Sequence, residues 1–107
     1  MFNLNPSPTF AVPVQLTIPG EPDTKAVAFT FRHKCKDPLA KWWAGYMQAP
    51  SVSTLAEVIE GWALKRDGES VLYTVEALDE LCQKYPAAMG EIADTYMLEL
   101  VRSKRKN

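Results

Sequence analysis

The sequence predicts an α+β fold in which an N-terminal antiparallel β-hairpin is followed by about four short amphipathic helices. Apolar residues alternate strictly over residues 10–18 and again over 27–33, with a turn-rich segment between them. From residue 39 onward, apolar residues instead recur at the i, i+3, i+4, i+7 spacing of helices. A chain of 107 residues is long enough for one core, so we predict a single domain over residues 1–107.

The hairpin prediction depends on which side chains share a face. In the first strand the apolar face consists of Phe10, Val12, Val14, Leu16 and Ile18. In the second strand it consists of Val27, Phe29, Phe31 and His33. Pro13 cannot donate a ladder hydrogen bond, so the first strand is predicted to lie at a sheet edge. The turn at 19–24 is too long for a two-residue connection, which leaves the strand register open.

The helix boundaries are predicted from capping residues. Asp37 followed by Pro38 is typical of a helix start, and Pro50 ends that helix. Thr54 with Glu57 has the form of a capping box for a second helix, and Thr74 caps a third. Pro86 lies in the first turn of a fourth. The four apolar sets are Leu39, Trp42, Trp43 and Tyr46; Leu55, Val58, Ile59 and Trp62; Leu78, Leu81, Cys82 and Tyr85; and Met89, Ile92, Ala93 and Tyr96, followed by Leu100.

Charge divides the chain into three parts. Residues 1–50 have a small basic excess, residues 51–101 carry ten acidic against three basic side chains, and residues 102–107 carry four basic side chains and no acidic one. An acidic helical half repels phosphate and favours a basic partner or the chain's own tail. Residues 1–8 and 102–107 are predicted to be extended or flexible.

No catalytic, metal or cofactor site is predicted, so we do not expect an enzyme. His33 and Cys35 are near neighbours of catalytic type, but no third residue is placed to orient them, and we interpret them as a strand end that leaves the core. The acidic residues lack an accompanying His and are interpreted as solvated helix faces. The five glycines are scattered and form no phosphate-binding loop.

The sequence predicts a cytoplasmic protein. Cys35 and Cys82 lie far apart, with no pairing pattern. No apolar run approaches the roughly 20 residues of a membrane helix, and the N-terminus lacks the features of a signal peptide.

Residues Trp42, Trp43, Tyr46 and Met47 are the candidate partner-binding set. Adjacent helical residues project about 100° apart, so a three-turn helix can scarcely bury both tryptophans. Exposed aromatic rings with a polar group are enriched at protein interfaces. The alternative is that both rings belong to the core. Trp62 is predicted to be a core residue, with Gly61 allowing close approach of another backbone.

The second half of the chain resembles a known family. The resemblance is carried by VIEGW at 58–62, Asp67-Gly68, Tyr73-Thr74, Leu78, Leu81, YPAA at 85–88 and IADTY at 92–96. With these motifs in this order and spacing, the chain from residue 55 to the end resembles the tail assembly chaperones of long-tailed, siphovirus-type bacteriophages.

That resemblance implies a non-catalytic helper of a phage or prophage, acting in the host bacterial cytoplasm. Such proteins bind the tape measure protein before tail tube subunits replace them, which makes the tail tube protein a second expected partner. Many are made in two forms, of which this chain would correspond to the shorter. We expect an amphipathic helix of the tape measure protein to contact Trp42, Trp43 and Tyr46 within acidic surroundings. Self-association stays open.

A second hypothesis is a small nucleic-acid-associated regulatory or adaptor protein. It would use Phe29, Phe31, Arg32, Lys34 and the basic tail, since aromatic and cationic side chains bind single strands. Strand alternation argues against it, because the two phenylalanines share one face and the two cations share the other.

Overall fold

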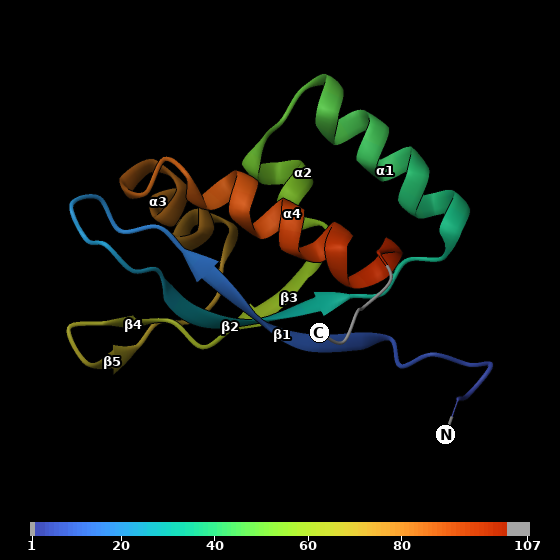
Figure 1. The fold of residues 1–107 in the computed structure, drawn as a ribbon, viewed down its shortest axis with the longest axis horizontal. Helices are drawn as coiled ribbons and strands as arrows, with labels where there is room; N and C mark the ends of the chain where they lie inside the picture. Colours follow the sequence, from blue (N-terminus) through green and yellow to red (C-terminus); the bar gives the residue numbers. More distant parts are fainter. Residues whose placement is uncertain (1, 103–107) are drawn as a thin grey trace.

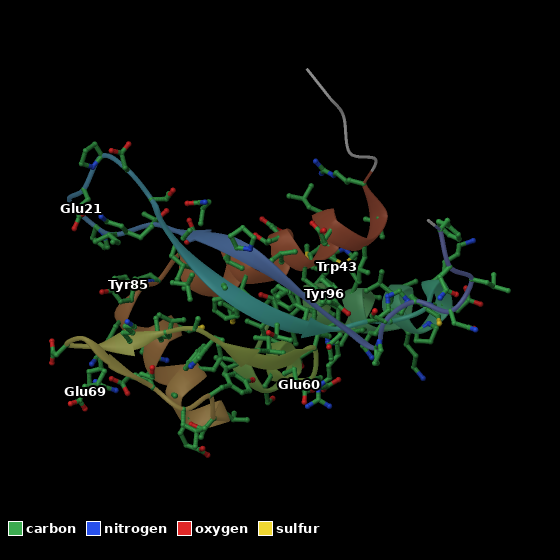
Figure 2. The ribbon with its side chains drawn as sticks, turned by 90° about the horizontal axis from the view of Figure 1, so that it is seen from below. Glu21, Trp43, Glu60, Glu69, Tyr85 and Tyr96 are labelled. Carbon is green, nitrogen blue, oxygen red and sulfur yellow. The ribbon has the colours of Figure 1, made fainter. Side chains whose placement is uncertain are left out.

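Helices cover one face of a three-stranded antiparallel sheet, and no helix of residues 2–102 covers the opposite face (Figure 1). The computed structural model describes residues 2–102. The sheet has the order β1-β2-β3, with β1 at Thr9–Leu16, β2 at Lys25–Arg32 and β3 at Ile59–Trp62. A separate hairpin pairs β4 at Lys65–Arg66 with β5 at Glu69–Ser70. Figure 2 looks onto the face of the sheet opposite the helices, with helices behind the strands.

Four helices form the second layer, which confirms the predicted fold class. They are α1 at Lys36–Gln48, α2 at Val52–Ala56, α3 at Val75–Lys84 and α4 at Ala88–Val101. Helix α4 packs against β1, and the short α2 contacts each of the other helices. The C-terminal end of α4 lies near the start of α1, while α3 lies at the other end of the molecule (Figure 1).

The hairpin forms as the alternation predicts. Phe10 pairs with Phe31 and Val12 with Phe29, so both apolar faces lie on the helical side of the sheet. Strand β1 pairs only with β2, which confirms the predicted edge position of Pro13. Residues 2–8 contain no helix or strand.

The free edge of β1 is protected at two places. The amide of His33 donates to the Pro8 carbonyl at 2.9 Å. Because every second residue of an antiparallel strand bonds to its partner strand, residue 8 and the even-numbered residues of β1 face β2. The backbone nitrogens of Pro13 and Thr17 therefore face the free edge. Pro13 offers no N–H to an approaching strand. The amide of Thr17 donates to the Glu91 carboxylate of α4 at 3.0 Å. Both features limit strand addition by another chain.

The predicted second helix is wrong over its second half. Helix α2 ends at Ala56, and residues 59–62 form strand β3 on the far edge of β2. Phe31 pairs with Ile59, whereas Phe29 pairs with Trp62, so one extra residue lies on β3 between these pairs. This β-bulge puts Ile59 and Trp62 on the same side of the sheet although they are three residues apart. The bulge therefore reproduces the apolar spacing of a helix.

The tight-approach role predicted for Gly61 is also wrong, because a Cβ there would meet nothing within 4 Å. Trp62 is half-buried and packs against the core rather than lying fully inside it. Its ring meets Phe29 edge-on at 5.8 Å between centroids.

Two predicted caps are replaced by neighbouring residues. Helix α1 begins at Lys36 after Cys35, so Asp37 lies in the first turn and does not cap it. Pro38 is still tolerated, because the first helical N–H groups have no acceptor within the helix. In α2 the cap is Ser51, whose hydroxyl accepts from the Thr54 amide at 3.2 Å. The predicted Thr74 cap of α3 is confirmed.

The β4–β5 hairpin is a feature that the sequence analysis missed. Asp67 and Gly68 both have positive φ, 49° and 87°, as a two-residue type I′ turn requires. The hairpin is held to α3 by Arg66, which lies 2.8 Å from Glu80. Lys84 also contacts Glu80, at 2.6 Å. Hydrogen bonds from these two cations lower the pKa of Glu80 to about 2.

Tyr96 joins the two layers. Its side chain is fully buried, and its hydroxyl donates to the Arg32 carbonyl at the end of β2 at 2.7 Å. The ring lies 5.1 Å from Phe31 and 5.4 Å from Trp42, centroid to centroid. Burial raises the pKa of Tyr96 to about 12, so the hydroxyl remains a donor at neutral pH.

We predict that Tyr96→Phe destabilises the fold by about 1 to 2 kcal/mol, because it removes this hydrogen bond while keeping the ring. Urea denaturation measures the difference. Tyr85→Phe is the control, since the Tyr85 side chain is only half-buried and makes no hydrogen bond within residues 2–102. An equal loss in both variants would contradict the role assigned to the Tyr96 hydroxyl.

Candidate partner-binding surface

The four candidate residues of α1 separate into buried and accessible pairs. Trp42 and Tyr46 are core residues, only 7% and 4% exposed. Trp43 is half-buried, and Met47 is 58% exposed. Residues 42 and 46 therefore fix α1 to the fold, and 43 and 47 are the pair that another protein can reach.

Trp42 and Tyr46 are held by hydrogen bonds to two different helices. The Trp42 indole N–H donates to the Thr54 carbonyl of α2 at 3.0 Å. The Tyr46 hydroxyl donates to the Met89 carbonyl of α4 at 3.5 Å. Burial raises the pKa of Tyr46, which keeps this hydroxyl protonated. These bonds set the rotation of α1 about its axis, and so the direction in which Trp43 points.

Trp43 is the tryptophan whose indole N–H finds no acceptor within the described part of the chain. Trp42 donates to α2, and Trp62 donates to the Val71 carbonyl at 2.9 Å. The Trp43 ring stacks on Tyr46 at 5.7 Å between centroids. One edge of this ring is thus supported by the core, while its N–H remains available to water or to a partner.

Helix α4 supplies the other side of this surface. A hollow of about 420 Å³ lies between the start of α1 and the end of α4. Its apolar wall consists of Leu39, Ala40, Trp43, Met97, Leu100 and Val101.

A second hollow of about 380 Å³ adjoins the first. It is lined by Trp43, Asp94, Met97, Leu98, Val101 and Arg102. Trp43, Met97 and Val101 border both hollows, so the two form one continuous region. Leu98 and Val101 are 44% and 59% exposed. We call this region, with Met47 one turn farther along α1, the α1–α4 surface.

The α4 half of the surface was not predicted from the sequence. The sequence analysis assigned α4 a narrow apolar stripe, yet four of the five residues at 97–101 are apolar: Met97, Leu98, Leu100 and Val101. A helical turn that is apolar nearly all round belongs to a buried or an interface segment. This turn ends the helix and is partly exposed, so its apolar composition is the sequence feature that indicates an interface there.

The expected acidic surroundings are not found at the first hollow. His33, Lys34 and Lys36 line the first hollow, which has no acidic residue in its wall. One acidic and one basic side chain, Asp94 and Arg102, line the second hollow. Acidic residues are shared equally by α4 and by α3, which lies at the opposite end of the molecule from the start of α1 (Figure 1).

His33 and Cys35 follow β2 and both line the first hollow. Cys35 is exposed, whereas burial raises the pKa of the Cys82 thiol to about 11. Within residues 2–102, no group of three or more His, Cys, Asp or Glu side chains is arranged to hold a metal ion.

The nucleic-acid hypothesis loses its aromatic platform. Phe29 and Phe31 are fully buried beneath the helices and cannot stack on bases. Of the basic tail, Arg102 is described, and the rest lies outside the described residues. No helix among the described residues is both long and apolar enough to span a membrane.

Comparison with known proteins identifies the family. A family model described as phage tail assembly chaperone matches residues 1–107, the whole chain. The protein therefore belongs to the phage tail assembly chaperones. No curated protein and no solved structure matches it.

The two adjacent tryptophans should differ sharply on truncation. We predict that Trp42→Ala destabilises the fold by about 3 to 5 kcal/mol, because it opens a cavity and removes the bond to α2. Trp43→Ala should cost less than about 2 kcal/mol, since part of this ring is already in water. Urea denaturation of both variants checks the difference, and equal losses would contradict the division between core and surface.

Proposed function

We propose that this chaperone binds the tape measure protein of its phage through the α1–α4 surface. Family membership supports a tail assembly partner. The observation that carries the proposal is the exposed apolar region around Trp43, Leu98 and Val101, beside an indole N–H without an acceptor in the described chain. Two neighbouring hollows divided by an aromatic ring suit the apolar side chains of one amphipathic helix.

The proposal extends the earlier expectation for the four α1 residues. Trp43 and Met47 contact the partner directly. Trp42 and Tyr46 act from behind, by fixing the orientation of α1. Binding covers apolar surface on a long, aggregation-prone chain until tail tube subunits take its place, which makes the tail tube protein a second candidate partner.

We further propose that this role is non-catalytic and that the protein acts in the cytoplasm of the host bacterium, for a phage or a prophage. Membership of the phage tail assembly chaperones supports the non-catalytic role. Assembly of a tail needs the chaperone only to bind and release its partner.

The direct test is co-expression with a tape measure protein from the same phage. The soluble fraction of the tape measure protein should rise severalfold with the wild-type chaperone. Leu98→Gln should abolish most of that rise, because it places an amide within the apolar contact.

Leu72→Gln is the matched control, since Leu72 is 82% exposed and lies outside the α1–α4 surface. This variant should behave as the wild type does. If the tape measure protein is equally insoluble with and without the chaperone, the proposed function is wrong. If the two variants behave alike, the function survives but the assigned surface does not.

A further inference from the structure

We infer that the α1–α4 surface selects an amphipathic helix with acidic residues along the flank that enters the first hollow. The inference rests on the proposed function and names the chemistry of the segment that is bound. It is drawn from the charge around the hollow, which is opposite to that of the chain's helical half.

The wall of the first hollow combines apolar and basic side chains. Leu39, Met97 and Leu100 are among the apolar ones. Lys34 and Lys36 line the hollow from the segment that enters α1, where Lys34 is half-buried and Lys36 exposed, and we call them the rim lysines. With no acidic side chain in this wall, an incoming carboxylate meets cations and no opposing charge.

The two rim lysines are available for pairing. Elsewhere in the described chain, Arg32 pairs with Glu60 at 3.0 Å, and Arg66 and Lys84 both pair with Glu80. Neither Lys34 nor Lys36 makes an ion pair within residues 2–102. A partner carboxylate therefore gains an interaction without breaking one that the fold already uses.

Charge also sets the direction of approach. Helix α3 carries Glu76, Asp79 and Glu80, and it lies at the end of the molecule away from the start of α1 (Figure 1). Helix α4 carries as many acidic residues, Glu91, Asp94 and Glu99, but none of them lines the first hollow. An acidic segment is therefore attracted to the first hollow by its two lysines. A basic helix with the same apolar residues is instead repelled by the lysines of the first hollow.

The test uses two designed amphipathic peptides of about 18 residues, which span about five helical turns. They share a leucine face and differ only in carrying Glu or Lys along its flanks. The fluorescently labelled Glu peptide should bind at least about tenfold more tightly than the Lys peptide in low salt, and the difference should shrink as salt is raised.

Charge reversal on the chaperone provides the matched comparison. Lys34→Glu with Lys36→Glu should weaken binding of the Glu peptide about tenfold and strengthen binding of the Lys peptide. Lys25→Glu with Lys65→Glu makes the same change in net charge at exposed positions outside the hollow, and it should leave both affinities within about twofold.

Cys35 reports where the peptide lies. Its exposed thiol lines the first hollow, so the bound Glu peptide should slow its modification by a thiol reagent at least about threefold. An unchanged rate, or equal affinities for the two peptides, would overturn the inference.

The outcomes separate this inference from the function. If co-expression rescues the tape measure protein while the rim reversal leaves peptide binding unchanged, the chaperone role stands and the acidic-helix selectivity is wrong. If the Glu peptide binds and protects Cys35 but the tape measure protein is not rescued, the selectivity stands and the proposed partner is wrong.

Discussion

The burial of Tyr96 is the constraint on which the rest of the structure depends. Its hydroxyl holds the end of β2, and its ring contacts Phe31 of the sheet and Trp42 of α1. Helix α4 is thereby fixed against the sheet, and α1 is fixed against α4. Tyr96 therefore contacts both layers of the structure from within its buried core.

Once Trp42 is directed inward, the helix geometry turns Trp43 outward by about 100°. The bonds from Trp42 to Thr54 and from Tyr46 to Met89 prevent α1 from rotating to bury the second ring. The apolar last turn of α4 then lies beside this ring and extends the exposed region. The exposed apolar surface therefore follows from the contacts that hold Trp42 and Tyr46 in the core.

The sequence predicted those elements whose pattern had a single structural explanation. Strict alternation identified the hairpin, and Pro13 identified its edge strand. The helix predicted over residues 55–62 is wrong in its second half because a β-bulge at Glu60 gives a strand the apolar spacing of a helix. That strand forms by pairing with the free edge of β2, which the local sequence does not reveal. At the candidate site, the sequence left open whether both tryptophans lie in the core or one is exposed, and it did not indicate which one would be exposed. That choice depends on acceptors supplied by α2 and α4, which are distant in sequence. The basic wall of the first hollow could not be predicted from net charge along the chain, because the β2–α1 segment and the end of α4 meet only in the fold.

The three tryptophans allow the central claim to be measured in one experiment. In the ¹⁵N-labelled chaperone, each indole N–H gives its own resonance, and a soluble tape measure fragment can be titrated against all three. The account predicts that the Trp43 resonance moves or broadens while those of Trp42 and Trp62 stay in place, because their N–H groups already bond Thr54 and Val71. A shift at Trp62 with Trp43 unmoved would contradict it.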